Sequence, residues 1–491
     1  MKNRMSKMDR LLSALVFLTV FGVLILIPKD GSTHKSKGNP EVRHSVRLIL
    51  NNYAAEMAKL QKLDLDIAGV NLAKNLVDLI VTEDELTLLE KSGFKIQRTF
   101  TELSGSRPDA EYKTPEKVET LLKKYTADYP AITQLKQIGK SVEGRPIWAI
   151  KITNHAEQKD LEKPTILFNG MHHAREVMSS EVPVDIIDSL LTGYGKDAKI
   201  THWVDANEIW VIPMLNVDGN NKVWTSNNWW RKNTRGGYGV DINRNYPYAW
   251  NTCNGSSGNP SSDTFRGPSG GSEPETQTLM GLVKDIHPVF DISFHSYSEL
   301  VIYPYGCPNQ HTQTKEVVEA IGAEIANLLP SDDGSGHYTS GTAPELLYAV
   351  DGGDIDWLYH EAQVLPYVIE LNSSSQGFQP SYSQWRDRTV QKIRPAWGLL
   401  LDKLDASSIR GQTVTVEGGI VANSVITLER LNTPNQPFTQ TYRVNADGTY
   451  HLVLNPGAYN LTYSAPGFQS QTKKVTVEGQ RVNETVQLAK P

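Results

Sequence analysis

Residues 164–191 read PTILFNGMHHAREVMSSEVPVDIIDSLL, and this stretch sets the architecture of the central part of the chain. It opens on an apolar run, PTILF, that is typical of a buried strand, and residues 177–191 read as a helix. Two adjacent histidines, an arginine and a glutamate crowd into the turn between them. Open α/β sheets bind their ligands at the carboxyl ends of their strands. The turn is therefore the first candidate for a functional site.

The alternation of apolar strands and long helices extends through residues 111–404. Further strands are predicted at RPIWAIKIT, ANEIWVIPML, VFDISFHS and VLPYVIEL. Helices are predicted at TPEKVETLLKKYTADYP, TKEVVEAIGAEIANLLP and SQWRDRTVQKIRPAWGLLLDKL. This pattern predicts an α/β domain with a mixed central sheet and helices on both faces.

Two smaller units are predicted on either side of this domain, as expected for a chain of 491 residues. Residues 45–101 follow the order β-α-β-β-α-β, which predicts a ferredoxin-like α+β unit. A polar linker, ELSGSRPDAE, follows it. Residues 411–491 contain short strands separated by Gly, Pro and Asn turns, which predicts a small all-β sandwich.

The amino terminus carries an export signal. Basic residues precede the uncharged run LLSALVFLTVFGVLILIP, and residues 1–30 therefore read as a signal peptide. The run is long and no A-x-A site follows it, so an uncleaved membrane anchor stays open as an alternative. We expect a secreted, extracellular or periplasmic protein.

Composition narrows the function further. A net charge of −6 and a pI near 6.1 argue against a general nucleic-acid binder. The only cysteines are Cys253 and Cys307. They are expected to pair in an oxidising compartment, with two free thiols as the alternative.

His173 and Glu176 form a His-x-x-Glu pair at the start of the predicted helix. A spacing of three residues puts both side chains on one side of the first helical turn. The motif alone is weak, because such a pair arises by chance about once in a chain of this length. His295 ends another apolar strand and could supply the third ligand of a zinc site with one open position. A histidine there could equally be a core or rim residue.

Other polar residues also follow apolar strands or lie in the long loop between them. Arg231 and Arg244 would suit an anionic group, since arginine binds carboxylates in bidentate fashion. Glu370 ends the strand VLPYVIEL, where burial would raise its pKa toward that of a working base. Each of these residues alone is also compatible with a purely structural role.

Taken together, the motifs resemble those of zinc carboxypeptidases of the pancreatic and bacterial carboxypeptidase T kind. The likeness is carried, in order along residues 111–404, by GKSVEGRPIWAIKI, NGMHHAREV, NWWRKNTR, GVDINRNY, FRGPSGGSEPET, SFHSYSELVIYPYG, LLYAVDGGDIDW and VIEL. Residues 45–101 are similar to the pro-segment of that family. Residues 411–491 resemble the transthyretin-like module that is attached to some members.

The resemblance implies a site for one zinc ion and a set of catalytic residues. It assigns the zinc ligands to His173, Glu176 and His295. It makes Glu370 the general base and Arg231 the residue that stabilises the oxyanion. His172 has no ligand role in the family, so we expect it to shape the loop.

The resemblance also implies a binding site for the carboxyl terminus of a peptide. The substrate-binding residues that it assigns are Arg175, Asn243, Arg244, Tyr297, Tyr348 and Ile355. Asn243 and Arg244 hold the terminal carboxylate, Tyr348 covers it from a mobile loop, and Arg175 is an accessory contact.

Ile355 falls where the family carries either an apolar residue or an aspartate at the base of the specificity pocket. We therefore expect a preference for hydrophobic or aromatic termini. The neighbouring Asp354 is offset by one residue, and we expect its carboxylate to turn out of the pocket. Activity on basic termini is the alternative if the loop is shifted by one residue.

The expected function is that of a secreted proenzyme that hydrolyses the last peptide bond of peptides or proteins after cleavage by an activating protease. An alternative enzyme class is a zinc amidase that acts on murein peptides or acylated amino acids. A third class is a surface-binding protein whose β-sandwich carries the function. The intact ligand and base positions argue against the third class.

Overall fold

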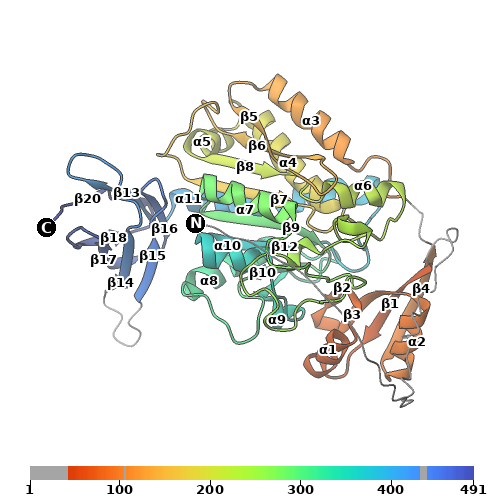
Figure 1. Cartoon of the computed structure of the whole chain (residues 1–491). Coiled ribbons are helices and arrows are strands. Elements are labelled where there is room, and N and C mark those ends of the chain that lie inside the picture. Colours follow the sequence, from red (N-terminus) through yellow and green to blue (C-terminus); the bar gives the residue numbers. More distant parts are fainter. Residues whose placement is uncertain (1–41, 104–106, 432–438) are drawn as a thin grey trace, which may run out of the picture. The chain divides into compact units, whose positions relative to one another are not determined.

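The computed structural model describes residues 42–103, 107–431 and 439–491 (Figure 1). The predicted signal peptide or membrane anchor, residues 1–30, lies outside the described residues. Within the described ranges, no helix has the length and apolar character needed to cross a lipid bilayer.

A mixed sheet of eight strands forms the centre of the region 111–404, in the order β11-β10-β12-β9-β7-β8-β6-β5 (Figure 1). The strands are β5 (Thr133–Lys140), β6 (Pro146–Ile152), β7 (Thr165–Gly170), β8 (Glu208–Ile212), β9 (Phe290–Ser296), β10 (Leu300–Tyr303), β11 (Thr339–Thr342) and β12 (Leu365–Leu371). The inner strands β12, β9, β7 and β8 are parallel. Antiparallel pairing joins β10 to β12 and β6 to β8 and β5. The predicted mixed sheet is confirmed.

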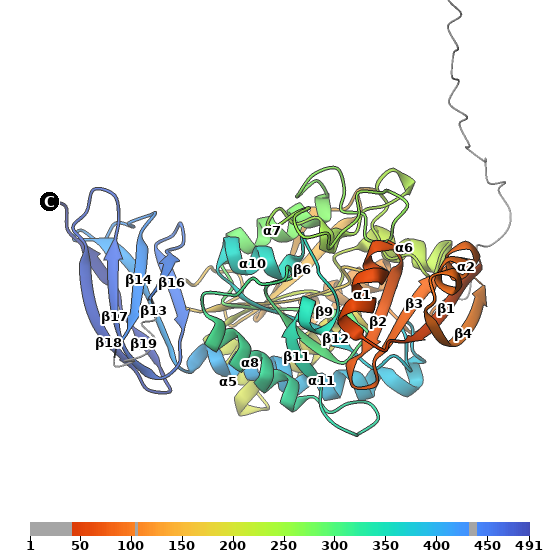
Figure 2. The ribbon, with the colours of Figure 1, turned by 90° about the horizontal axis from the view of Figure 1, so that it is seen from below.

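Helices cover both faces of this sheet. They are α3 (Pro115–Asp128), α4 (Met178–Gly193), α5 (Ala198–Ala206), α6 (Val217–Thr225), α7 (Pro274–Ile286), α8 (Lys315–Leu328), α9 (Ala343–Leu346), α10 (Asp354–Ala362) and α11 (Tyr382–Asp405). Helices α5, α8 and α11 lie on one face, and α7 and α10 lie on the other (Figure 2). The apolar cluster between helices and sheet includes Ile166, Phe168, Phe294 and Ile369, all fully buried.

The parallel strands bring three functional segments to one edge of the sheet. Strand β9 pairs with β7 on one side and with β12 on the other. The loop that carries His173 follows β7, His295 lies at the end of β9, and Glu370 lies opposite His295 in the register of β12. Polar residues that are distant in the sequence thus meet at the carboxyl ends of the parallel strands, which is where open α/β sheets bind their ligands.

The amino-terminal unit has the predicted order of strands and helices. It contains β1 (Val42–Ile49), α1 (Tyr53–Lys62), β2 (Asp66–Asn71), β3 (Leu76–Val81), α2 (Glu83–Lys91) and β4 (Lys95–Leu103), with a 3₁₀ turn at Leu72–Lys74. Its antiparallel sheet has the order β2-β3-β1-β4. A capping box between Thr82 and Glu85 begins α2.

The carboxy-terminal unit consists of two four-stranded sheets that share an apolar core. Its strands are β13 (Ser408–Thr415), β14 (Val425–Arg430), β15 (Thr439–Arg443), β16 (Thr449–Val453), β17 (Gly457–Ser464), β18 (Gln471–Val477), β19 (Arg481–Asn483) and β20 (Val486–Leu488). The alternating burial of β17 explains its pattern of apolar and polar residues. The predicted β-sandwich is confirmed.

Cys253 and Cys307 form a disulfide, so the expected pairing is confirmed. The bond joins the loop before α7 to the segment that follows β10.

Candidate active site

His173, Glu176 and His295 converge on one buried point. The Nδ1 atom of His173 lies 2.7 Å from Glu176 Oε1 and 3.1 Å from His295 Nδ1. His295 Nδ1 lies 3.2 Å from Glu176 Oε2. Two imidazole nitrogens and a carboxylate that face one another at such distances fit a bound cation, and this donor set is one that zinc prefers. The three residues thus form a candidate zinc site.

The charge of Glu176 suits this role. Burial alone would raise the pKa of its carboxyl, but the adjacent His173 and His295 outweigh burial and lower that pKa. Glu176 Oε2 also accepts a hydrogen bond from the Ser296 N–H, at 3.2 Å. The carboxylate is therefore ionised and held in place from β9.

The outer faces of the two candidate ligand histidines have polar neighbours. His173 Nε2 lies 3.3 Å from Asp241 Oδ1, and His295 Nε2 lies 3.2 Å from Ser293 Oγ. Such partners fix the ring orientation and raise the basicity of a metal-bound imidazole. Burial would raise the pKa of Asp241, but the charge of Arg231 in particular outweighs burial and holds that pKa well below its usual range. The sequence analysis missed Asp241, although it lies within the motif GVDINRNY.

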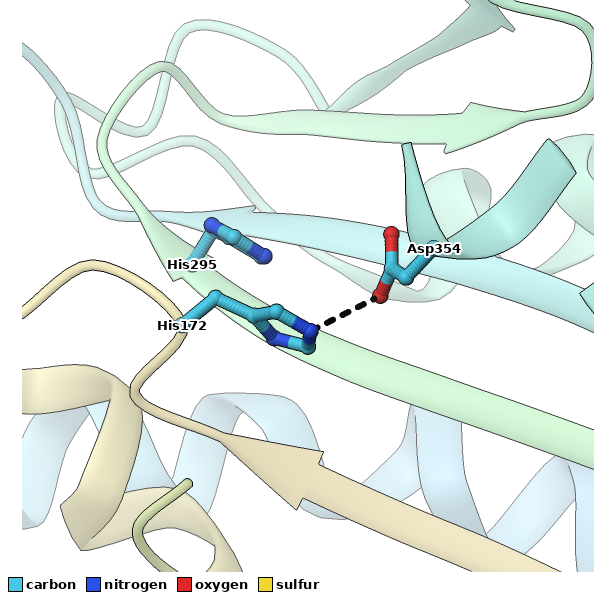
Figure 3. Close-up of side chains that lie close together, drawn as sticks. All are labelled: His172, His295 and Asp354. Carbon is cyan, nitrogen blue, oxygen red and sulfur yellow. Dashed lines mark ion pairs between the residues drawn. The ribbon is translucent and has the colours of Figure 1, made fainter. Parts of the chain in front are cut away.

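His172 belongs to a second buried group, with Asp354 and with His295 (Figure 3). Its Nε2 lies 3.0 Å from Tyr246 Oη and 3.6 Å from Asp354 Oδ2. Its Nδ1 lies 3.2 Å from Ser293 Oγ, so both ring nitrogens have hydroxyl partners. Burial lowers the pKa of His172 to about 4. These contacts fit a neutral, structural histidine better than a metal ligand.

Glu370 faces the candidate metal site from β12. Burial raises its pKa to about 8, against the opposing effect of His295. A cation bound by the neighbouring ligands would lower this pKa, because it stabilises the carboxylate. A carboxyl group tuned in this way is suited to accept and return a proton near neutral pH.

Arg231 completes the charged side of the site. Its Nε and Nη2 donate to Asp241 Oδ2, at 3.1 and 2.9 Å, and its Nη1 lies 3.8 Å from Glu176 Oε1. One carboxylate thus orients both the Arg231 guanidinium and the His173 ring.

A small cavity of about 70 Å³ joins these groups to the predicted substrate-binding residues. The predicted residues that line it are His173, Glu176, Arg231, Asn243, Arg244, His295, Tyr297, Tyr348, Ile355 and Glu370. Arg244 Nη1 donates to the Asn243 carbonyl at 2.8 Å, and Asn243 Oδ1 accepts from the Asp354 N–H at 2.9 Å. The structure therefore gathers ten of the eleven predicted site residues around one space.

Two aspartates of α10 also line this cavity. The Asp354 carboxylate accepts from the Ile355 N–H through Oδ1 and faces His172 through Oδ2 (Figure 3). Asp356, which the sequence analysis did not single out, accepts the Gly306 N–H at 3.0 Å, and burial raises its pKa to about 7. Ile355, which lies between them in the sequence, is also buried.

Arg175, the eleventh residue, is not among those that line the cavity. It is fully buried, donates two hydrogen bonds to Asp66 of β2, and stacks over the Phe378 ring at 4.2 Å. An accessory contact with a substrate would require that Asp66 move away.

Strand β2 of the amino-terminal unit forms part of the cavity wall. Ile67, Ala68 and Gly69 are among the residues that line it. A Cβ atom on Gly69 would lie 2.5 Å from the Tyr297 ring, so only glycine permits this approach. The next residue, Val70, donates its N–H to Ser298 Oγ at 3.0 Å.

The chain matches the zinc carboxypeptidase family model over residues 118–394 and the carboxypeptidase regulatory-like domain over residues 408–489. Metallocarboxypeptidase A of Arthroderma otae is 31% identical over 74% of this chain and 92% of its own length. Carboxypeptidase B of Homo sapiens is 30% identical over 56% of this chain and 67% of its own.

The fold is also similar to that of a solved carboxypeptidase. The crystal structure of carboxypeptidase A from Helicoverpa armigera superposes with a TM-score of 0.61 at 21% identity, over 74% of this chain and 96% of that one. The family model alone covers more than half of the sequence. The chain therefore belongs to the zinc carboxypeptidase family and is a metallocarboxypeptidase.

Proposed function

We propose that this protein is an exported proenzyme that removes hydrophobic or aromatic residues from the carboxyl termini of peptides. The observation that carries the proposal is the single cavity shared by the candidate zinc ligands, Glu370 and the pair Asn243 and Arg244. The zinc ligands and Glu370 would hydrolyse the peptide bond, and Asn243 and Arg244 would restrict cleavage to a chain end, since only the last residue carries a free α-carboxylate next to its peptide bond.

The chemistry follows from the residue types. A zinc ion held by His173, Glu176 and His295 would polarise the scissile carbonyl and activate a water molecule. Glu370 takes the proton of the attacking water and returns it to the leaving amine. The Arg231 guanidinium faces the negative charge that develops on the carbonyl oxygen, where a preorganised cation is most effective.

Apolar side chains surround Ile355 in the part of the cavity that we assign to the terminal side chain. Ile355 lies in an apolar cluster with Ile302, Leu347 and Val368. An apolar terminal side chain gains about 25 cal/mol per Å² of surface that it buries there. This supports a preference for Phe, Tyr, Leu and similar residues.

Residues 45–101 act as an inhibitory pro-domain, residues 111–404 as the catalytic domain and residues 411–491 as an accessory β-sandwich. The pro-domain role is supported by Ile67–Gly69 at the cavity and by the pairing of Asp66 with Arg175. Cleavage by an activating protease within about residues 102–112, which the sequence ELSGSRPDAE marks as a polar stretch, would free the site. Export rests on the basic and apolar residues at the amino terminus.

The decisive experiment compares the uncut and the nicked protein on blocked dipeptides that end in Phe. Nicked protein should contain about one zinc per chain and hydrolyse the dipeptide with a free carboxylate, but not its carboxamide. Equal rates before and after nicking would reject the inhibitory role of residues 45–101. Efficient hydrolysis of the carboxamide would reject an exopeptidase that requires a chain end.

A further inference from the structure

A hydrogen bond connects Arg244, which is proposed to bind the terminal carboxylate, to the loop that carries Cys253 of the disulfide between Cys253 and Cys307. Arg244 Nε donates to the Gly255 carbonyl at 3.0 Å. Gly255 belongs to residues 252–256, which we call the Cys253 loop. Because this carbonyl holds one edge of the guanidinium, the direction in which Arg244 points depends on where the Cys253 loop lies.

The Cys253 loop is arranged around one buried carboxylate. Asp351 Oδ2 accepts the N–H groups of Thr252, Cys253 and Gly255, at 3.1, 3.0 and 3.1 Å, and its Oδ1 accepts the hydroxyl of Ser256. A Cβ on Gly255 would lie 2.4 Å from the Asp351 nitrogen, so the two backbones touch. The loop is thus packed against the segment that joins Tyr348 to α10.

The other half of the disulfide is tied to the base of the specificity pocket. Both sulfur atoms lie 3.9 Å from the Val350 carbonyl oxygen. Val350 donates its N–H to the Gly306 carbonyl at 2.8 Å, and Gly306 donates its own N–H to the Asp356 carboxylate. Cys307 follows Gly306 directly, so the bond connects the Cys253 loop to the two segments that form the pocket wall.

The Cys253 loop is partly exposed, although Asp351 accepts four hydrogen bonds from it. Thr252 and Asn254 are exposed, and Asn254 and the preceding Asn251 have positive φ angles of 59°. Exposed loop segments open more easily than the buried core of a fold. The covalent bond adds a restraint to the hydrogen bonds of Asp351.

We propose that the disulfide between Cys253 and Cys307 is a positioning element for substrate binding, which fixes the Gly255 carbonyl and through it the Arg244 guanidinium. This inference rests on the proposed exopeptidase function. Loss of the bond should weaken the binding of the terminal carboxylate. The zinc ligands and Glu370 should keep their positions, because none of the hydrogen bonds described above joins them to the Cys253 loop.

The test is the variant Cys253→Ser/Cys307→Ser, nicked and assayed on the blocked dipeptide that ends in Phe. We expect KM to rise about tenfold, which corresponds to about 1.4 kcal/mol. We expect kcat to stay within about threefold and the zinc content to stay unchanged. Reduction of the folded wild-type enzyme with a phosphine, followed by reoxidation, should raise KM and then restore it, and this arm serves even if the variant fails to fold.

Leu401→Ala is the matched control for lost stability. Leu401 is fully buried in α11, and its truncation costs about 2–5 kcal/mol without touching the Cys253 loop. It should leave KM unchanged. The proposal would be overturned if the enzyme without the disulfide is folded and contains zinc, and if its KM stays within about twofold of wild type. Hydrolysis of the dipeptide by the wild-type enzyme tests the proposed function separately. The role of the disulfide is tested only by the ratio of KM in the variant to KM in wild type.

Discussion

Arg175 donates from both Nη atoms to the two carboxylate oxygens of Asp66, at 2.5 and 2.7 Å, and both side chains are buried. Burial would raise the pKa of the Asp66 carboxyl, but the Arg175 guanidinium outweighs burial and lowers it. The pair therefore joins β2 to the loop of the candidate zinc ligands as two full charges.

Asp66→Asn should weaken the inhibition of the uncut protein. Leaving Arg175 buried without its partner costs about 3–5 kcal/mol at this contact. We expect initial rates of the uncut variant on a blocked dipeptide to rise by about fivefold or more over the uncut wild type.

The control for this experiment is Glu85→Ala, which removes the capping box of α2 and destabilises the same unit away from the cavity. It should activate the uncut protein less than Asp66→Asn. Unchanged rates for Asp66→Asn would show that the ion pair does not contribute to closure of the site.

Glu370→Gln should leave zinc bound and lower kcat by about 10²–10⁴, because it removes the proton carrier and keeps the shape of the side chain. His173→Ala and His295→Ala should instead lose the metal. Metal analysis beside steady-state kinetics separates the two classes. Turnover by Glu370→Gln near that of wild type would assign the base to another residue.

The convergence of the candidate site residues could be predicted from the sequence where motifs and strand ends coincide. His173, Glu176, His295 and Glu370 each follow or end an apolar strand, so parallel pairing brings them together. The partner of Arg175 could not be predicted in this way, because Asp66 lies 109 positions away in another unit.

Polar residues whose importance depends on burial could not be predicted from the sequence either. Asp241 connects His173 to Arg231, and Asp351 gathers the N–H groups of the Cys253 loop. An aspartate in a loop rich in Asn and Gly reads as a turn residue, and its hydrogen-bond partners are set by tertiary packing.

Glu275 should make the stability of the protein fall as pH rises. It is buried, accepts from the Val142 N–H and from Asn233 Nδ2, each at 3.1 Å, and burial raises its pKa to about 7. A raised pKa means that the folded state binds the proton more tightly than the unfolded state. The contribution of Glu275 to the free energy of unfolding is fully present below the pKa of the unfolded state. It is lost between about pH 4.5 and 7, at about 1.4 kcal/mol per pH unit.

Glu275→Gln removes this dependence. The thermal midpoint of the variant relative to wild type should therefore be higher at pH 8 than at pH 5. A difference between variant and wild type that is the same at both pH values would show that the Glu275 carboxyl does not titrate in this window.

The specificity pocket gives the most discriminating prediction. Ile355, which we propose forms the base of this pocket, lies in an apolar cluster, and the Asp354 carboxylate faces His172 at 3.6 Å. We expect kcat/KM for dipeptides that end in Phe or Leu to exceed that for Lys or Arg by at least about tenfold, or about 1.4 kcal/mol.

Ile355→Asp should reverse the order, because it places a carboxylate where a basic side chain would end. Asp354→Asn is the matched variant and should leave the preference unchanged. Equal or better cleavage of the basic dipeptides by wild type, abolished in Asp354→Asn, would place the Asp354 carboxylate inside the pocket and make this a carboxypeptidase for basic termini as well.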